Sequence, residues 1–536
     1  MELPPDLYCL LKDLPTALIV GGAVRDFLLG ESPKDFDLEV QNISQKSTLS
    51  ILAKHGTVEL VGASFGVFKV TTPQKNTYDV SLPRTENSIG KGHKDFEIHT
   101  DPTLPFATSA LRRDLTINAM AWNPTSKTLI DPFGGEADLK QKTLRHVSDK
   151  FSEDLLRPLR LLQFSSRFGF TIHPSTLAVC QTLAPLINLN MLPAERIEEE
   201  FMKFLLKGKF HRLALKEFQK TGWLDLFPEI ASLHNLPQDP EHHPEGDVLT
   251  HTGLCLEALR LIPDYQSSSP LSKKILSLAT LCHDLGKSTT TTHVFDEKLQ
   301  RTKIMSPNHQ IEGLIPTASL LKKLNQPPKT IQNVCLLVKH HMDHIWTDPS
   351  PSNVAALAAK LSPTNPHAPS PTLCQSISTL AILVEADLSG REPNPKGLPN
   401  KMKVLAEKAA ELGCLNAPLK NPITGNDLIQ NGFTPGKIFD SILKALYLEV
   451  IDRPSLSQSE ALNILKAPET LLKKSGECPP PLLNAKTLMA MGVPPNASLG
   501  KLINTLLRLQ IFNRISTPQE AIKIVNARHS PPLPEL

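Results

Sequence analysis

The sequence lacks the features of a membrane protein, a disulfide-stabilised secreted domain or a zinc-ribbon protein. No stretch approaches the roughly 20 uncharged apolar residues that a membrane span needs, and residues 1–14 lack the pattern of a secretory signal. The eight cysteines are scattered, without a CxxC pair, which predicts reduced thiols and a cytoplasmic protein. The net charge is only +3, so RNA binding would depend on local basic patches.

The composition is ordinary for a globular protein of several domains. The chain has 536 residues, of which 40% are hydrophobic and 21% charged, and this length predicts three or four domains. Short β-branched apolar runs at 17–20, 36–40, 67–70 and 78–80 predict strands. From about Glu153 onward the apolar residues recur with helical spacing. We therefore expect an α+β protein, with a β-containing head followed by an all-helical body.

The helical body contains two Pro/Ser-rich stretches and a weak internal repeat. Residues 348–372 and 477–483 are rich in proline and predict loops. Residues 427–432 are echoed by residues 487–492, and each copy continues through a proline to Gly-Lys and an apolar residue. Two copies of the pattern predict a duplicated helical module in the tail.

The most informative segment lies between residues 20 and 40. Gly21-Gly22 follows a predicted strand and opens a helix, where backbone N–H groups can approach a phosphate. Asp35 and Asp37 are two apart, so on a strand their carboxylates point to the same side. Two adjacent carboxylates favour a cation between them, and oxygen ligands suit Mg²⁺. Asp79 on a later predicted strand is a candidate third carboxylate, and a two-metal site of this kind supports phosphoryl transfer.

Five motifs in chain order resemble those of the class II tRNA nucleotidyltransferase and bacterial poly(A) polymerase family. They occupy residues 21–37, 112–120, 131–139, 153–160 and 195–203. The resemblance implies a polymerase β-like mixed sheet in the head. It also implies that the first two motifs bind the incoming nucleotide and its triphosphate through Gly22, Arg25, Arg112, Arg113, Asp114 and Asn118.

The fourth motif contains an acceptor and a donor that could recognise a base. Asp154 and Arg157 are three apart on a predicted helix and would share one face. Aspartate only accepts hydrogen bonds and arginine only donates, so the pair complements the amino group and ring nitrogen of cytosine and adenine. Uracil and guanine present the opposite pattern and would leave buried groups unpaired. Arg160 is expected to contact phosphate or to hold Asp154.

A second metal site is predicted in the helical body. His251, His283, Asp284 and Asp387 follow one another as H…HD…D, and imidazole with carboxylate suits a transition metal. The pattern resembles the HD phosphohydrolase superfamily, a domain that some bacterial CCA-adding enzymes carry. That resemblance implies Ni²⁺ or Mn²⁺ and a 2′,3′-cyclic phosphodiesterase or phosphatase activity. His309, His340 and His341 are possible extra ligands or phosphate contacts, and a vestigial, tRNA-binding HD domain is the alternative.

The sequence therefore predicts four domains and a reaction. These are a nucleotidyltransferase head (1–145), a nucleobase-recognising neck (146–235), an HD domain (236–400) and a duplicated tail that could contact tRNA (401–536). The expected activity is addition of CCA to tRNA from CTP and ATP, with no membrane or protein partner implied. A poly(A) polymerase, an enzyme adding only CC or only A, or an RNA-binding or nucleotide-hydrolysing protein with an inactive head remain alternatives.

Overall fold

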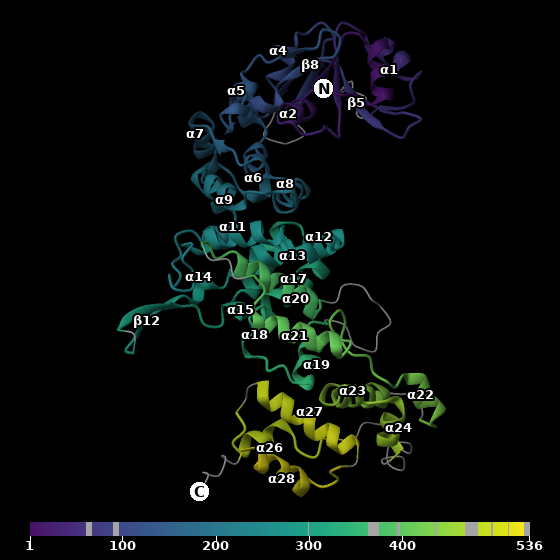
Figure 1. Ribbon diagram of the computed structural model, residues 1–536, viewed down its shortest axis with the longest axis vertical. Coiled ribbons are helices and arrows are strands. Elements are labelled where there is room, and N and C mark those ends of the chain that lie inside the picture. The colour runs from purple at the N-terminus through teal and green to yellow at the C-terminus, as the bar shows by residue number, and fades with distance from the viewer. Residues whose placement is uncertain are drawn as a thin grey trace. The chain divides into compact units, whose positions relative to one another are not determined.

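The computed structural model describes residues 1–60, 67–88, 96–298, 300–362, 375–393, 397–433, 435, 437–466, 481–494, 497–512 and 514–529 (Figure 1). These residues divide into two compact units. The first contains residues 1–339 and 385–397, and the second contains residues 340–384 and 398–536. Within the described ranges, no helix has the length and apolarity to cross a membrane.

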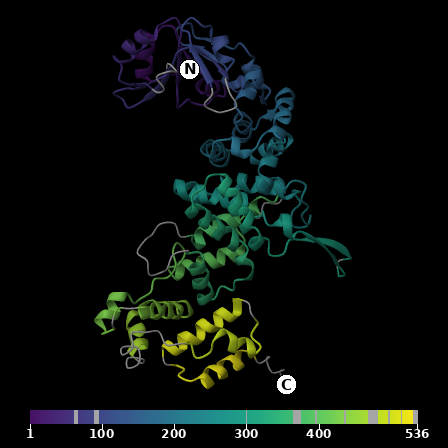
Figure 2. The same ribbon diagram turned by 180° about the vertical axis from the view of Figure 1, so that it is seen from behind.

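The first unit begins with a seven-stranded mixed sheet, in the order β3-β4-β5-β2-β1-β8-β9. Its strands are β1 (Ala17–Val20), β2 (Asp37–Val40), β3 (Thr57–Leu60), β4 (Val67–Thr71), β5 (Thr77–Ser81), β8 (Ala121–Asn123) and β9 (Thr128–Ile130). Neighbours are antiparallel except for β2 and β5, which are parallel. In a separate two-stranded sheet, β6 (Arg84–Ser88) pairs antiparallel with β7 (Phe96–Thr100). The mixed sheet confirms the predicted fold class (Figure 2).

Burial explains why these short runs form strands. All four residues of β1 are buried, as expected for a central strand, whereas β4 and β5 alternate buried and more exposed residues. Five helices accompany the sheet: α1 (Pro5–Asp13), α2 (Gly22–Leu28), α3 (Gln45–Leu52), α4 (Phe106–Ala110) and α5 (Gly135–Lys140). Leu18 and Val20 of β1 pack with Phe106 and Ala110 of α4. This packing fixes β1 and, through its pairing, β2.

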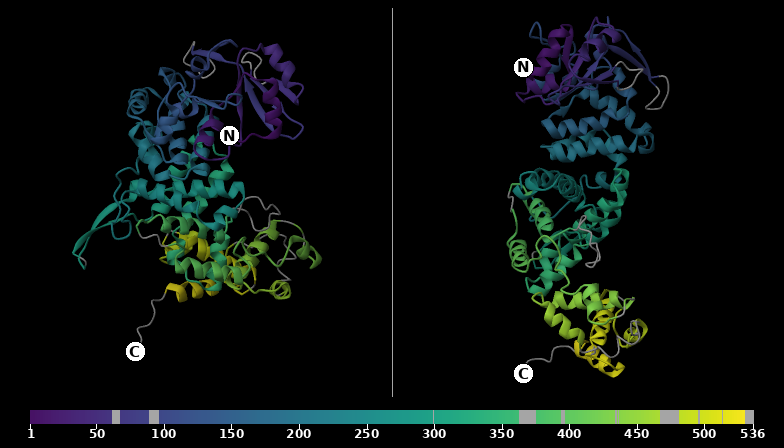
Figure 3. Two further views of the ribbon diagram at one scale, coloured as in Figure 1. Left: turned by 45° about the horizontal axis from the view of Figure 1, so that its top comes forward. Right: turned by 90° about the vertical axis from the view of Figure 1, so that its right-hand side faces the viewer.

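A helical neck follows the sheet. Its helices are α6 (Arg157–Phe168), α7 (Pro174–Leu183), α8 (Ala194–Lys207), α9 (His211–Lys220) and α10 (Pro228–Ala231). Between sheet and neck lie β10 (Thr143–Leu144), which pairs with β11 (Thr171–Ile172), and the 3-10 turn η2 (Asp149–Glu153). Helix α6 packs against α8 and α9, and it ends at Gly169, whose positive φ of 70° closes the helix. Figure 3 shows these helices in the blue part of the chain.

The HD region of the first unit is mainly helical. Its elements are α11 (Val248–Leu259), α12 (Pro263–Ser267), α13 (Pro270–Cys282), α14 (Lys287–Thr290), α15 (His309–Glu312), α16 (Leu314–Lys323) and the hairpin of β12 (Thr292–Asp296) and β13 (Arg301–Met305). Helix α11 packs against α9 of the neck and against α13. Helices α17 (Pro328–His340) and α20 (Ile377–Ser389) each contain a boundary between the two units.

The second unit corrects one prediction made from the sequence. Residues 348–372 were expected to form a loop, yet α19 (Pro351–Lys360) lies within them, and residues 363–372 are outside the described ranges. Proline at the first turn is compatible with a helix, and the following alanines favour one. The helices α18 (Asp343–Trp346) and α21 (Asn400–Glu411) accompany α19. Of the second predicted loop, residues 477–480 lie outside the described ranges.

In the described part of the tail, a pattern of three helices occurs twice in succession. The first copy contains α22 (Gly425–Gln430), α23 (Lys437–Asp452) and α24 (Gln458–Lys466), and the second contains α26 (Ala485–Ala490), α27 (Ala497–Ile511) and α28 (Pro518–His529). The buried residues Ile423, Leu428, Ile442 and Ala461 each have a buried apolar counterpart 60 positions later, at 483, 488, 502 and 521. Gly436 and Pro495 of the repeated pattern lie outside the described residues.

Candidate functional site

The turn between β1 and α2 brings the glycine motif against the second arginine motif. Gly21 has a φ of 73°, and its N–H donates to the carbonyl of Met120 at 3.1 Å. A side chain at Gly21 would meet Arg113 Nη1 at 2.9 Å. The positive φ therefore favours glycine, and the absence of a side chain lets the guanidinium approach the turn closely. Gly22 is the first residue of α2, as predicted.

The three predicted carboxylates gather at the parallel pair of strands. Asp37 and Asp79 are register partners on β2 and β5, and Asp35 lies just before β2. Burial raises the pKa of Asp37; Arg113 lowers it, while the negative charges of Asp79 and Asp35 raise it further. Carboxylates that oppose one another's ionisation in this way favour a bound cation. The residues present therefore fit a divalent metal site.

Two other residues of the predicted nucleotide site are engaged within the protein. Arg25 is buried, and its guanidinium donates to Asn118 Oδ1 at 2.6 Å and to Asp26 Oδ1 at 2.6 and 2.8 Å. The guanidinium carbon also lies 4.8 Å from the ring centre of Phe168 and 5.5 Å from that of Phe164, both on α6. Arg25 thus connects the glycine motif to the neck, and its direct contact with a nucleotide stays a prediction.

Asp114 and Arg160 form the main ionic contact between head and neck. Arg160 Nε donates to Asp114 Oδ2 at 2.6 Å, and Asn118 Nδ2 and the Leu115 N–H donate to Asp114 Oδ1. Burial alone would raise the pKa of Asp114, but the Arg160 charge and these hydrogen bonds outweigh it and lower the pKa to about 2. Arg160 also lies 3.5 Å from Glu200 of α8.

The base-reading pair is placed differently from the sequence prediction. Asp154 precedes α6 with extended dihedral angles (φ −108°, ψ 102°), so the two residues do not share a helical face. Asp154 accepts from the Leu156 N–H at 3.0 Å and from Arg196 Nη2 at 3.1 Å. Arg157 donates to the carbonyl oxygens of Lys150 and Arg112 at 2.7 and 2.6 Å. Proline at 158, which suits the first turn of a helix, explains why α6 begins at Arg157.

The second predicted site forms a buried cluster in the HD region. The Nε2 of His251 lies 3.2 Å from Asp387 Oδ1 and 3.7 Å from Asp284 Oδ2. The Nε2 of His283 lies 3.3 Å from Asp284 Oδ2, and that of His309 lies 3.4 Å from Asp284 Oδ1. The structure thus brings together the four predicted ligands and His309.

The other nitrogen of each imidazole has an oxygen partner that orients the ring. The Nδ1 of His251 lies 2.6 Å from Glu245 Oε1, that of His283 lies 2.8 Å from the carbonyl of Thr280, and that of His309 lies 2.8 Å from the carbonyl of Ser306. With Nδ1 as donor, each Nε2 presents a lone pair on the side of the carboxylate oxygens, where a cation could bind both kinds of atom. This is the arrangement that metal-ligating histidines adopt, so the donor set fits a transition metal.

Several residues of this cluster were not identified from the sequence. Glu245 accepts from both His251 and His243, and these hydrogen bonds outweigh burial and lower its pKa to about 2. Its only sequence signal was its position in an acid- and histidine-rich run just before α11. Lys287 Nζ lies 2.7 Å from Asp284 Oδ2. Helix α13 ends at Cys282, and His283 follows as its C-cap residue.

His340 and His341 belong to the second unit. There, His340 Nδ1 lies 2.9 Å from Asp343 Oδ2, which with other contacts outweighs burial and lowers the pKa of Asp343. Their role as extra ligands or phosphate contacts stays a prediction.

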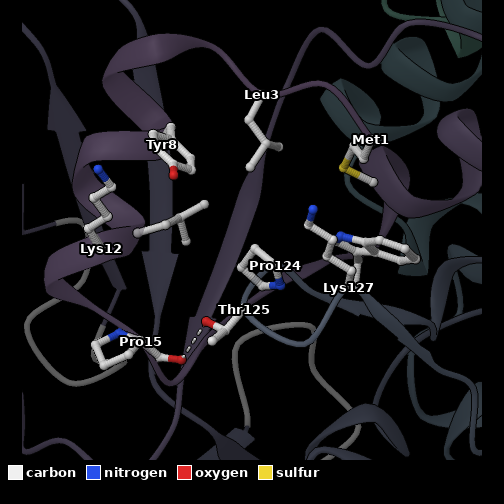
Figure 4. Close-up of a pocket in the computed structure, with 10 residues that line it drawn as sticks. Met1, Leu3, Tyr8, Lys12, Pro15, Pro124, Thr125 and Lys127 are labelled. Atoms are coloured by element: carbon white, nitrogen blue, oxygen red, sulfur yellow. Dashed lines mark hydrogen bonds between the residues drawn. The ribbon is translucent and has the colours of Figure 1, made fainter.

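A separate pocket in the head contains none of the predicted site residues. It has a volume of about 630 Å³ and is lined by α1 and by the turn between β8 and β9. Figure 4 shows Tyr8 and Lys12 of α1 facing Pro124, Thr125 and Lys127 across it. Lys12 Nζ lies 4.7 Å from the centre of the Tyr8 ring. The lining carries no cluster of acids or imidazoles, so this pocket does not share the chemistry of the two metal-binding candidates.

Three family models match consecutive parts of the chain. The Poly A polymerase head domain matches residues 17–145, the probable RNA and SrmB-binding site of polymerase A matches residues 169–233, and the HD domain matches residues 248–384. Among curated proteins, the multifunctional CCA protein of Haemophilus influenzae (strain PittGG) is 38% identical over 58% of this chain and 70% of its own length. That of Xylella fastidiosa (strain M23) is 34% identical over 70% and 83%, respectively.

Solved structures share the fold. A crystal structure of the Bacillus stearothermophilus CCA-adding enzyme in complex with CTP aligns with a TM-score of 0.56 at 21% identity, over 84% of this chain and 94% of that one. The Thermotoga maritima CCA-adding enzyme complexed with tRNA aligns with a TM-score of 0.53 at 18% identity, over 86% and 95%.

A mixed head sheet with paired carboxylates, a helical neck and an HD cluster define a nucleotidyltransferase joined to an HD domain. The coverage and identity of the curated relatives go further. The chain belongs to the multifunctional CCA protein family.

Proposed function

We propose that this protein adds CCA to the 3′ end of tRNA, using CTP and ATP. The observation that carries the proposal is the register pairing of Asp37 with Asp79, beside Asp35 and within the influence of Arg113. Such a cluster can hold the divalent metal of a nucleotidyl transfer and a triphosphate at one place. The names of the relatives, which are CCA proteins and CCA-adding enzymes, support tRNA, CTP and ATP as substrates.

Asp35, Asp37 and Asp79 would hold the divalent ions, for which Mg²⁺ is the natural choice because all three ligands are carboxylates. Bound there, the ions would supply charge neutralisation and activation of the terminal 3′-hydroxyl. The hydroxyl oxygen attacks the α-phosphate of the incoming nucleotide, its proton is lost, and pyrophosphate leaves. Arg112 and Arg113 would bind the triphosphate, and the turn at Gly21 and Gly22 would approach it closely.

Asp154 and Arg157 would select the base without a nucleic-acid template. Asp154 is fixed by Arg196 and the Leu156 N–H, while Arg157 bonds to the Arg112 carbonyl beside the triphosphate motif. An acceptor on Asp154 and a donor on Arg157 match cytosine and adenine and leave uracil and guanine unpaired. Arg160 would act through its ion pair with Asp114 and position the neck against the head.

The test uses tRNA transcripts that end in the discriminator base, in C or in CC, each incubated with one nucleoside triphosphate at a time. The proposal predicts addition of C to the first two transcripts and addition of A to the third only. Repeated addition of A to every transcript would instead identify a poly(A) polymerase, and addition of only C or only A would identify a partial enzyme. Absence of all addition would leave the RNA-binding or hydrolytic alternatives.

A second activity is supported by the buried cluster of His251, His283, Asp284 and Asp387. We propose that it holds a transition metal such as Ni²⁺ or Mn²⁺ and hydrolyses a phosphate ester, with a 2′,3′-cyclic phosphate as the first candidate substrate. The metal would supply an activated water. Release of phosphate or opening of a cyclic phosphate at an RNA end tests this, and the His283→Ala variant should lose that activity while nucleotide addition continues.

The tail is proposed to contact tRNA through its second copy. Residues 481–529 contain six lysines and arginines against one acidic residue, whereas residues 421–469 contain four against six. Lys486 and Lys523 are exposed on the second copy. A basic surface attracts the RNA backbone without regard to sequence.

The six cysteines that the structure describes are free thiols, which supports action in the reducing cytoplasm. No protein partner is proposed.

A further inference from the structure

A cysteine lies among the donor atoms of the HD cluster. Cys255 follows His251 by four residues on α11, so the two side chains share a helical face. Its Sγ lies 3.3 Å from His251 Nε2 and 3.6 Å from the carbonyl oxygen of Asp387. His251, Cys255, His283 and Asp387 each offer one donor atom, and these four atoms all lie within 4.8 Å of one another. The sulfur is therefore part of the cluster and not only near it.

The chain around Cys255 leaves room for the sulfur at this place. Cys255 is fully buried, and a side chain at Gly390 would meet its Sγ at 2.5 Å. Gly390 lies three residues after Asp387, so the segment that carries this carboxylate also accommodates the thiol. A buried cysteine is often only a small apolar residue. Here, however, Cys255 Sγ lies next to His251 Nε2, the nitrogen that also faces the Asp387 carboxylate.

The separations match two donors that share one ion. Metal–nitrogen bonds of about 2.0–2.1 Å and metal–sulfur bonds of about 2.3 Å place the two donors roughly 3.1–3.6 Å apart for angles between about 90° and 110°. The distance of 3.3 Å between Cys255 Sγ and His251 Nε2 falls within this range. Because Sγ also lies 3.8 Å from Nδ1 of the same ring, one of the two side chains must turn for both donors to bind one ion. The distance of 3.2 Å between His251 Nε2 and Asp387 Oδ1 suits a pair of donors in the same way.

We propose that Cys255 is a further ligand of the HD metal and gives the site a sulfur donor beside imidazole and carboxylate. The thiol loses its proton to solvent as the sulfur–metal bond forms. The proposal rests on the proposed metal centre, and it is independent of nucleotide addition and of the ester that the centre hydrolyses. Because thiolate is a soft ligand, it favours Zn²⁺ and Co²⁺ over Mn²⁺.

Cobalt provides a direct test in the full-length protein. A cobalt–thiolate bond produces a charge-transfer band in the near ultraviolet that nitrogen and oxygen ligands do not, while bands in the visible report bound Co²⁺ whatever its ligands. Titration of the metal-free protein with Co²⁺ should give both sets of bands. The Cys255→Ser variant should keep the visible bands and lose the near-ultraviolet band. Cys282→Ser is the matched control, since Cys282 is also a buried thiol of the HD region, and it should keep both.

The affinity for metals provides a second readout. Equilibrium dialysis measures the ratio of the affinity for Zn²⁺ to the affinity for Mn²⁺. This ratio should be at least about tenfold lower in the Cys255→Ser variant than in the wild type. Cys255→Ala serves the same purpose if the serine variant unfolds, and nucleotide addition by the head checks that the variants are folded. An unchanged near-ultraviolet band in both Cys255 variants would overturn the sulfur ligand while leaving the metal centre. An unchanged cobalt spectrum in His251→Ala would overturn the metal centre itself.

Discussion

Asp114 illustrates how a single residue connects the head to the neck. Its carboxylate accepts hydrogen bonds from Arg160 on α6 and from Asn118 in its own motif. Asn118 in turn accepts from Arg25, whose guanidinium lies against the aromatic rings of α6. The resemblance of the first two motifs implied that Asp114, Asn118 and Arg25 bind the nucleotide. The contacts indicate that these side chains also hold the glycine motif and the neck in register.

The Asp114 pair should make stability depend on pH. The folded-state pKa of about 2 lies below the usual 3.8, so the stabilisation is fully present above pH 4 and is lost as the pH falls toward 2. Its size is about 2 kcal/mol. The measurement is urea unfolding, followed by the fluorescence of Trp122 and Trp223 in a Trp346→Phe background. At pH 6 the free energy of unfolding of Asp114→Asn should be lower than that of the wild type by this amount. A difference that stays constant down to pH 3 would contradict the assignment.

Glu245 should act on metal binding without being a ligand itself. It accepts from His251 Nδ1 at 2.6 Å and so presents Nε2 to the cluster. Glu245→Gln should weaken metal binding by roughly 10–100-fold, measured by isothermal titration with Mn²⁺ or Ni²⁺. Asp247→Asn in the same loop is the control, because the Asp247 side chain caps α11 by accepting from the Thr250 N–H, and only its backbone carbonyl bonds to His251. Equal affinities of wild type and Glu245→Gln would exclude this positioning role.

At the scale of elements, the turn from β1 to α2 determines the geometry of the head site. A side chain at position 21 would be strained by the positive φ and would displace Arg113. Gly21→Ala should therefore lower stability by about 1–3 kcal/mol and should also raise the KM for CTP and ATP. Gly30→Ala is the comparison, because Gly30 has a similar φ of 77° and no atom within 4 Å of the added carbon. If both variants raise KM equally, the contact with Arg113 is irrelevant.

The sequence predicted the elements with strong periodicity and failed where local chemistry overrode it. Four strands were predicted because each contains a short run of apolar residues that includes β-branched ones: β1, β2, β4 and β5. The start of α6 was misplaced because the run from Glu153 has helical spacing, although Pro158 favours a first turn only at 157. Helix α19 was missed because prolines at both ends hid an alanine-rich core. Glu245 and Cys255 could not be assigned, since only the fold brings Glu245 to His243 and His251 and brings Cys255 to His283 and Asp387.

The two copies of the duplicated tail differ in net charge. Within the second unit, Glu449 of the first copy is buried and pairs with Arg508 and Arg514 of the second. Ile511 and Phe512 of the second copy complete the apolar core of the first. The two copies therefore pack as one body, and the basic excess of the second belongs to a fixed surface.

Reversal of charge on this surface should weaken tRNA binding. Lys486→Glu with Lys523→Glu should raise the KM for full-length tRNA roughly tenfold at low salt, with a smaller effect at high salt. A short acceptor-stem RNA should be extended at the unchanged rate. Lys444→Glu in the acidic first copy, combined with Lys420→Glu just before it, is the matched control and should have little effect. An equal effect of both pairs would indicate a general change in charge and not a binding surface.

We infer that one carboxylate cluster in the head catalyses the addition of both C and A. The experiment compares wild type with Asp37→Asn in single-turnover rates of CMP addition to a transcript ending in C and of AMP addition to one ending in CC. Both rates should fall together, by roughly 10²-fold or more, while the HD cluster still binds metal. If either addition keeps the wild-type rate, a single shared cluster is excluded.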